Sequence, residues 1–265
     1  MLPLEEKAAA RSAIGPDSAI ERLREARAAL REDAESRWGL SGRVAELLFA
    51  FPLIGATLFA LTSTHDGLYS FLAREDSLLE WTQVAILAVA AVSATLLAVR
   101  SRREGRGRHA LAYVTLAAGC IFVAGEEISW GQRAVGLETP EALAEINRQD
   151  ELTLHNIDDV RVALKFFLIG LGLAGLALPW LLRRRGSRAY RFMPPLFMTT
   201  AFLVVATYNL TRLVFFPAGF FGSERHYKVF AFSEWPELLL GYVVCGVLAL
   251  RWRSGHARQE AERRA

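Results

Sequence analysis

The chain has 265 residues, of which 52% are hydrophobic and 22% charged, and its formal net charge is +3. A soluble domain is usually about 45–50% apolar, and here the apolar residues also gather in long blocks separated by charged stretches. The arginines lie in short segments beside these blocks. This placement is typical of membrane orientation and argues against a nucleic-acid partner. Cys120 and Cys245 both lie inside apolar blocks, which excludes a disulfide-stapled secreted scaffold.

The N-terminal segment, residues 1–43, is charged and lacks the early apolar stretch of a cleavable signal peptide. Ile20, Leu23, Ala26 and Leu30 recur at steps of three and four residues, which predicts an amphipathic helix. We expect this helix to lie on the cytoplasmic surface of the membrane. The alternative is a short coiled coil with a partner or with a second copy of the chain.

Six apolar blocks follow, and each is long enough to cross a hydrocarbon core, which needs about 17–25 helical residues. The blocks are residues 44–62, 78–99, 110–131, 160–182, 192–216 and 232–252. The sequence therefore predicts an all-α, polytopic membrane helix bundle of about six transmembrane helices. Its membrane domain covers residues 44–252, and residues 253–265 form a charged tail.

The loops between the blocks alternate in charge. Arginines are concentrated in the N-terminal segment, in the loops after the second and fourth blocks, and after the sixth block. The other three loops are acidic or mixed. The positive-inside rule then places both termini in the cytoplasm and the long loop 132–158 outside, in a multi-pass protein of a bacterial cytoplasmic (inner) membrane.

Ionisable and amide residues gather at the predicted outer ends of the blocks. They include Glu80, Glu126, Glu127, Arg133, His155, Arg161, Lys165, Tyr208, Asn209, Arg212, Glu234 and Glu237. Charged groups at membrane depth are costly and persist when they face a bundle interior, pair with one another or bind a metal. The pattern predicts one polar pocket that is open to the outer surface and roofed by residues 139–156. If the third helix continues past its block, Glu126, Ser129 and Arg133 share a face.

Three interpretations of this pocket remain open. In the first, Glu126, His155, Glu234 and Glu237 bind zinc, manganese or iron, and Glu126, Glu127 and His155 are catalytic. In the second, Arg133, Arg161 and Arg212 neutralise the glutamates in a structural ion-pair network. In the third, Arg133, Arg161, Lys165 and Arg212 clamp a phosphate or an anionic lipid while the carboxylates do chemistry.

The pocket as a whole predicts a membrane-embedded enzyme, a metal-dependent hydrolase or transferase that acts on a lipid or lipid-linked substrate. Membrane lipids are the expected partners, and Arg133, Tyr208, Asn209 and Arg212 are the expected substrate contacts. The alternative is a non-enzymatic membrane protein, either a transporter or a complex subunit. A transporter needs a polar path through the inner half of the bundle, and the sequence contains no such path.

One stretch of the chain resembles a known family. Gly-Glu-Glu-Ile-Ser-Trp-Gly-Gln-Arg at residues 125–133, with Glu-Thr-Pro-Glu at 138–141 and Leu-His-Asn at 154–156, is similar to a family of bacterial polytopic integral membrane proteins. The resemblance implies a multi-pass protein of a bacterial membrane. That family has no established activity, so the resemblance implies no mechanism.

Overall fold

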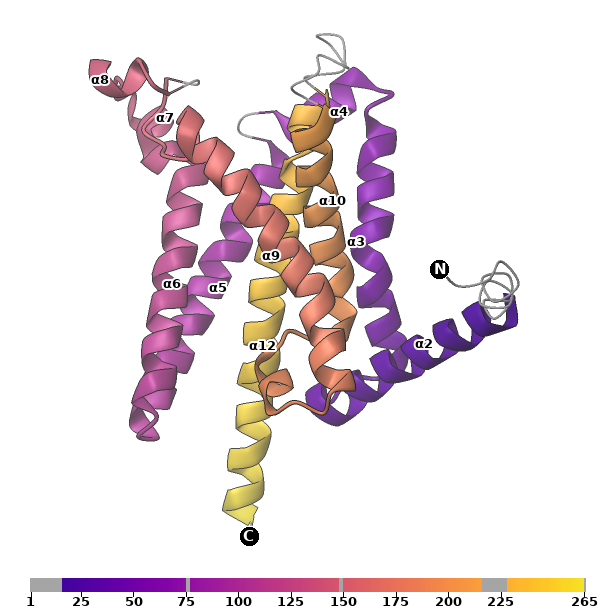
Figure 1. The fold of residues 1–265 in the computed structure, drawn as a ribbon. Helices are drawn as coiled ribbons and strands as arrows, with labels where there is room; N and C mark the ends of the chain where they lie inside the picture. Colours follow the sequence, from indigo (N-terminus) through magenta and orange to yellow (C-terminus); the bar gives the residue numbers. More distant parts are fainter. Residues whose placement is uncertain (1–15, 75–76, 148–149, 216–227, 265) are drawn as a thin grey trace, which may run out of the picture.

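The computed structural model describes residues 16–74, 77–147, 150–215 and 228–264 (Figure 1). The long helices are α2 (Pro16–Trp38), α3 (Gly42–Thr62), α5 (Leu78–Arg103), α6 (Gly107–Glu127), α9 (Asp158–Arg184), α10 (Thr199–Phe215) and α12 (Glu234–Arg264). The short helices are α4 (Asp66–Ala73), α7 (Gln132–Val135) and α8 (Glu141–Ala144), and the 3-10 turns are η1 (Ser129–Gly131), η2 (Arg188–Phe192) and η3 (Leu196–Met198).

The predicted all-α membrane bundle is confirmed. Among the described residues, six helical segments are long and apolar enough to cross a membrane, and they contain α3, α5, α6, α9, α10 and α12. The chain is therefore a multi-pass membrane protein by helix length and hydropathy. All six predicted blocks coincide with these segments.

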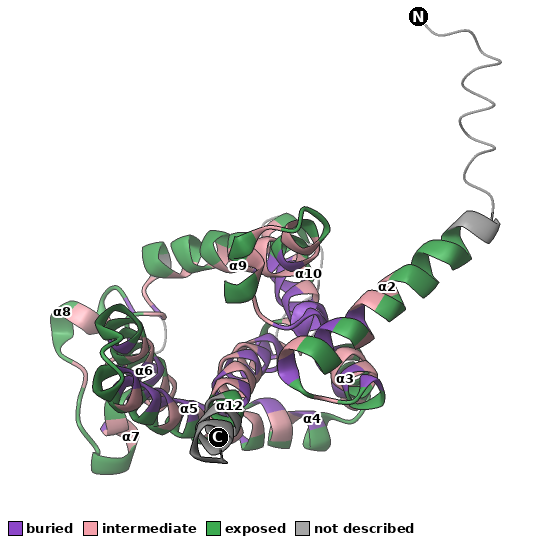
Figure 2. Ribbon diagram, turned by 90° about the horizontal axis from the view of Figure 1, so that it is seen from below, coloured by how far each residue is buried: buried purple, intermediate pink, exposed green. Residues whose placement is uncertain are grey.

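Four of the six spanning helices pack as two pairs, and α12 and α3 pack against them. Helices α5 and α6 form one antiparallel pair and α9 and α10 form the other, and α12 packs against both α5 and α10 (Figure 2). Helix α10 is the most buried of the six because α3, α9 and α12 all pack on it, whereas α9 is the most exposed. This arrangement leaves the α9 surface open to the surrounding lipid.

Small residues bring the paired helices close together, as is common where lipid supplies no hydrophobic drive between helices. Gly172 and Gly175 of α9 face α10, and a Cβ at Gly172 would lie 2.8 Å from the backbone nitrogen of Ala206. In the other pair, Ala90 and Ala94 of α5 are fully buried beside α6. The two pairs therefore form tight units, each joined to α12.

Two predicted helix ends differ from the structure. The third helix ends at Glu127 and not at residue 131, because Ser129, Trp130 and Gly131 adopt positive φ values of 47°, 53° and 78°. The predicted common face of Glu126, Ser129 and Arg133 is therefore wrong. The fifth block was expected to start at residue 192, but α10 starts at Thr199, after the prolines at 194–195 and the turn η3.

The Arg-rich connections lie together at one end of the bundle. The α5–α6 turn, the α9–α10 connection and the C-terminal end of α12 share this end, and α2 crosses it at a steep angle to the spanning helices (Figure 1). Glu46 of α3 accepts hydrogen bonds from Arg27 and Arg31 of α2, at 2.5 Å and 2.6 Å. These contacts fix α2 across the end of α3.

Asp33 connects α2 to the α9–α10 connection. Its carboxylate is 3% exposed and accepts hydrogen bonds from the Tyr190 hydroxyl at 2.6 Å and the Leu196 amide at 3.0 Å. Burial and the hydrogen bond to Asp33 raise the pKa of Tyr190, so its hydroxyl stays a donor. One buried carboxylate thus anchors the N-terminal helix to the membrane domain.

We expect Asp33→Ala to cost about 2–3 kcal/mol of unfolding free energy, because the buried Leu196 amide and the partly buried Tyr190 hydroxyl lose a charged acceptor. Glu32→Ala is the matched control, since the Glu32 side chain is 72% exposed and pairs with Arg183 at the surface. An exposed pair contributes about 0–1 kcal/mol. Denaturation in detergent micelles measures both variants, and equal losses would contradict the anchoring role of Asp33.

Candidate functional site

The chain turns sharply after α6, and the motif residues make the turn. The indole of Trp130 folds back over Gly125, where an added Cβ would lie 2.8 Å from the ring. The Trp130 Nε1 donates a hydrogen bond of 2.9 Å to Glu126, and the ring meets Phe122 edge-on. The Gly-Glu-Glu-Ile-Ser-Trp-Gly stretch is thus a local fold that ends the helix and reverses the chain.

Glu126 holds the far end of the long loop against this turn. Its Oε2 accepts hydrogen bonds from the backbone amides of Leu154 at 2.8 Å and His155 at 2.9 Å, and the His155 Nδ1 lies 3.2 Å away. The residue is 4% exposed. Glu126 therefore sets the position of His155 from beneath the loop.

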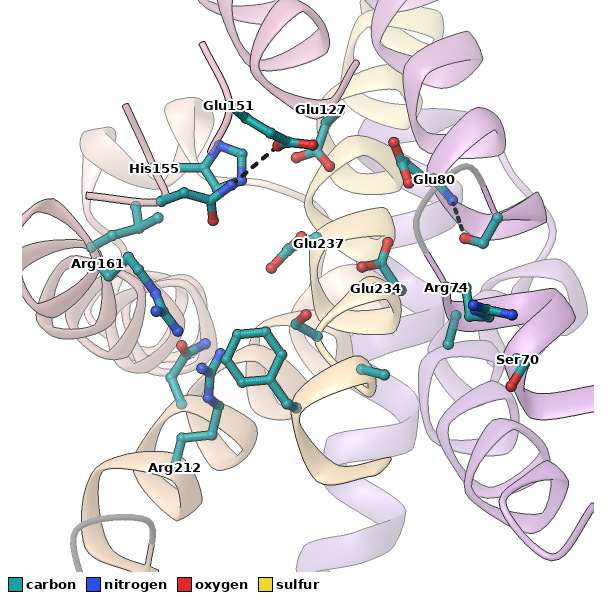
Figure 3. A pocket seen from close by; sticks show the side chains of 18 of the residues that line it. Ser70, Arg74, Glu80, Glu127, Glu151, His155, Arg161, Arg212, Glu234 and Glu237 are labelled. Atoms are coloured by element: carbon teal, nitrogen blue, oxygen red, sulfur yellow. Dashed lines mark hydrogen bonds between the residues drawn. The ribbon is translucent and has the colours of Figure 1, made fainter. Parts of the chain in front are cut away.

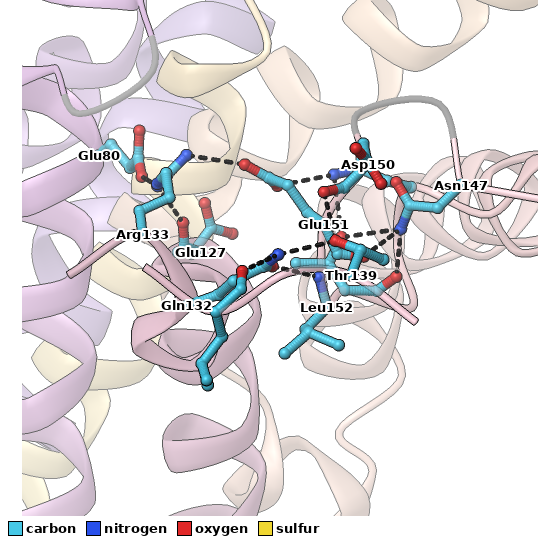
Figure 4. Close-up of polar contacts among 12 residues, drawn as sticks. Glu80, Glu127, Gln132, Arg133, Thr139, Asn147, Asp150, Glu151 and Leu152 are labelled. Carbon is cyan, nitrogen blue, oxygen red and sulfur yellow. Dashed lines mark hydrogen bonds and ion pairs between the residues drawn. The ribbon is translucent and has the colours of Figure 1, made fainter. Parts of the chain in front are cut away.

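The loop between α6 and α9 is ordered by side chains that bond its backbone (Figure 4). Gln132 donates to Leu137 O and Thr139 Oγ1, and it accepts from the Leu152 amide at 2.6 Å. Asn147 donates to Glu151 O and Thr153 O. These bonds bring Glu151 and His155 to fixed places beside the ends of α5 and α6.

A cavity of about 1040 Å³ lies at the end of the bundle opposite the Arg-rich connections (Figure 3). Its lining comes from α4, α5, the end of α6, α9, α10, the start of α12 and the long loop. The charged members are Asp66, Arg74, Glu80, Glu127, Arg133, Glu151, Arg161, Lys165, Arg212, Glu234 and Glu237, with His155, Asn156 and Asn209 as further polar groups. The predicted pocket therefore exists as a single volume.

One side of the cavity carries four carboxylates, Glu80, Glu127, Glu234 and Glu237, which we call the carboxylate side (Figure 3). Ser77 caps α5 by accepting from the Glu80 amide at 3.2 Å, which fixes Glu80 in the first turn. Arg133 pairs with Glu80 at 2.8 Å and with Glu151 at 3.0 Å (Figure 4). Arg133 therefore compensates Glu80, while Glu127, Glu234 and Glu237 repel one another electrostatically.

The other side carries Arg161, Lys165 and Arg212, which we call the cationic side. Arg161 and Lys165 are four residues apart on one face of α9. The guanidinium carbons of Arg161 and Arg212 lie 5.2 Å and 4.4 Å from the centre of the Phe230 ring. One aromatic ring from the segment before α12 thus brings two guanidinium groups together, an arrangement suited to a phosphate.

The predicted site residues divide into two groups. Glu127, His155, Arg133, Asn209, Arg212, Glu234 and Glu237 line the cavity, and Glu126 and Tyr208 do not. Tyr208 donates to the carbonyl of Phe230 at 3.0 Å and lines a separate apolar cavity of about 510 Å³ between α3 and α10. Tyr208 therefore holds the segment that carries Phe230.

The predicted metal ligands do not converge. Glu126 and His155 touch, but within the described ranges of the chain no three or more His, Cys, Asp or Glu side chains form a group that could hold a metal ion. The donor set Glu126, His155, Glu234 and Glu237 therefore does not fit one ion, and metal binding stays a prediction from the sequence.

The sequence placed Glu80 among the outer polar residues without giving it a role in the site, and it gave no role to Glu151. Glu80 is 7% exposed and forms the main ion pair of Arg133, and Glu151 completes that pair. The position of Glu80 in the first turn of an apolar helix was a sequence signal that its carboxylate takes part in the site. The role of Glu151 depends on how the long loop folds, which no periodicity in the sequence reveals.

The comparisons with known proteins give no relative. No family model, no curated protein and no solved structure matches this chain. The family resemblance of residues 125–133 is therefore not established by a match, and the site is interpreted from its own geometry.

Proposed function

We propose that this chain is a membrane-embedded enzyme that binds the headgroup of a lipid or lipid-linked substrate and hydrolyses or transfers it. The cavity supports this proposal because Arg161 and Arg212 line the same volume as Glu234 and Glu237 and lie across it from Glu234 (Figure 3). Ionisable groups inside membrane spans are costly and by default indicate a functional site. A volume of about 1040 Å³ also accommodates a headgroup with part of its glycerol backbone.

A lipid can reach this cavity from the side of the bundle. Helix α9 packs on α10, and Leu164 and Leu168 of α9 line the cavity beside Lys165. Phe166 and Phe167, on the outer surface of the same helix, are 56% and 62% exposed. Acyl chains would lie along α9 in the hydrocarbon layer while the headgroup enters the polar volume.

The two sides of the cavity have complementary roles in a displacement reaction at phosphorus. Arg161, Lys165 and Arg212 neutralise the phosphate oxygens. A carboxylate opposite accepts the proton of water or an acceptor hydroxyl as its oxygen bonds to phosphorus. A second carboxyl group protonates the leaving oxygen as the old bond breaks.

We assign the base to Glu237, because it adjoins the cationic side and is attracted by Arg212. Glu127 and Glu234 are the candidates for the acid. Glu126 is a positioning residue in this proposal, since it acts through His155 and the long loop.

The orientation is part of the proposal. The Arg-rich connections gather at one end, so the positive-inside rule places that end in the cytoplasm and the cavity at the outer leaflet. We expect a reporter fused after Arg103 to be cytoplasmic and one fused near Glu145 to be external. The reverse pattern would place the cavity at the inner leaflet.

The experiment is to follow lipid turnover in liposomes made from a total polar lipid extract, by mass spectrometry of the headgroups. We expect the wild type to form a new product and Glu237→Gln to form it at least about 100-fold more slowly. Glu145→Gln is the matched control, because Glu145 is an exposed residue of the loop outside the cavity lining. Equal rates in the wild type and Glu237→Gln would rule out Glu237 as the base.

A non-enzymatic role is the second candidate, and one observation favours it. Arg133 joins Glu80 of α5 to Glu151 of the long loop, which is the geometry of a structural ion-pair network. If the wild type forms no product from any lipid while cavity variants only lose stability, this second candidate replaces the first.

A further inference from the structure

Arg133 pairs with only one of the four carboxylates on the carboxylate side, Glu80, among the residues that the structure describes. Within the part of the chain that the structure describes, no ion pair joins Glu127, Glu234 or Glu237 to a cation within 4.0 Å. The Oε2 atom of Glu234 is buried and has no hydrogen-bond partner among the described residues. A buried acceptor without a donor is costly, so this side of the cavity favours a ligand that brings positively charged donors.

The cationic side of the same cavity is suited to a negatively charged group. Arg212 is 8% exposed and Arg161 shares the Phe230 ring with it, so both guanidinium groups are held in place before a ligand arrives. Planar guanidinium groups match the oxygens of a phosphate, and Lys165 adds a third cation from the same face of α9 as Arg161. The exposed Arg74 also borders the cavity.

A ligand that satisfies both sides must carry a phosphate anion and an ammonium group in one headgroup. The ammonium must also donate hydrogen bonds, because the buried Glu234 oxygen lacks a donor and not only a counter-charge. A primary ammonium has three N–H donors, whereas a trimethylammonium has none. The requirement for donors therefore separates ethanolamine from choline lipids.

We infer that the cavity is selective for an ethanolamine-type phospholipid, with the phosphodiester at Arg161, Lys165 and Arg212 and the primary ammonium at Glu234, which leaves Glu237 as the base and Glu127 as the acid. This inference rests on the proposed function and narrows it to one substrate class. Leu164 and Leu168 on α9 continue the cavity toward the lipid-facing surface, where the acyl chains would lie.

Titration calorimetry of the purified protein tests the selectivity. The probes are dihexanoyl phosphatidylethanolamine, its mono-, di- and trimethylated forms and dihexanoyl phosphatidylglycerol, each below its critical micelle concentration. We expect phosphatidylethanolamine to bind at least about tenfold more tightly than the trimethylated form or phosphatidylglycerol. Affinity should fall with each added methyl group, and this series requires no variant.

Two variants assign the selectivity to its residues. Glu234→Gln should remove the advantage of phosphatidylethanolamine without weakening phosphatidylglycerol binding, because loss of a negative charge does not disfavour an anionic lipid. Arg212→Gln should weaken binding of all the lipids. Thermal unfolding of each variant verifies that it is folded.

The failure of this inference is distinguishable from that of the proposed function. If phosphatidylethanolamine and phosphatidylglycerol bind equally and Arg212→Gln weakens both, the ethanolamine inference is overturned and the proposed headgroup site stands. If none of the probes responds to Arg212→Gln, both are overturned.

Discussion

Replacing Arg133 by methionine is expected to cost about 3–5 kcal/mol of unfolding free energy, because it leaves a buried carboxylate without its cation. Glu80 is 7% exposed, and it forms an ion pair of 2.8 Å with Arg133. The same substitution releases Glu151 and thereby the far part of the long loop. Unfolding of the purified protein by a denaturing detergent measures the loss.

A second substitution distinguishes this cause from lost packing. In Arg133→Met/Glu80→Gln the buried charge is gone, so the double variant should regain a large part of the stability lost by Arg133→Met. A single-variant loss below about 1 kcal/mol would show that the pair behaves as a surface ion pair, and the ion-pair account of this end of the bundle would then fail.

Replacing Glu126 by alanine is expected to free the long loop. Two backbone amides, of Leu154 and His155, and the Trp130 indole would each lose their acceptor, at a cost of about 1–3 kcal/mol for each unsatisfied group. We expect faster hydrogen–deuterium exchange at residues 154–155 and little change in α9 or α10. Gln132→Ala should free the same loop from its other anchor at Leu152.

Glu126→Gln then separates positioning from catalysis. If Glu126 only positions the loop, each variant, Glu126→Ala and Glu126→Gln, should lose turnover in proportion to its faster hydrogen–deuterium exchange at His155. A large loss of turnover with unchanged exchange would instead make Glu126 a catalytic residue, as the sequence alone predicted.

The spanning helices could be predicted from the sequence because bilayer thickness and hydropathy determine them. The end of α6 could not. The turn depends on Ser129 and Trp130 at positive φ, which few residues other than glycine adopt, and on the indole folding over Gly125. A helical pattern that continues through residue 133 gives no sign of this turn.

The residue types of the candidate site could be predicted from the sequence. Which of these residues line the cavity could not. Glu126 and Glu127 are neighbours in sequence, yet Glu127 lines the cavity while Glu126 turns to the long loop. In the same way, Asn209 of α10 lines the cavity, whereas its neighbour Tyr208 donates a hydrogen bond to the Phe230 carbonyl. Which of two adjacent residues faces a cavity depends on how each helix rotates against its neighbours, and that rotation is a tertiary property.

The most direct test of the account is to identify the lipid retained by the purified protein with native mass spectrometry. We expect the wild type to keep one phosphate-bearing lipid per chain, and Arg161→Gln and Arg212→Gln to lose it. Arg103→Gln, an exposed arginine at the opposite end of the bundle, should keep it. Retention of the same lipid by all four proteins, or by none of them, would contradict a headgroup site in the cavity.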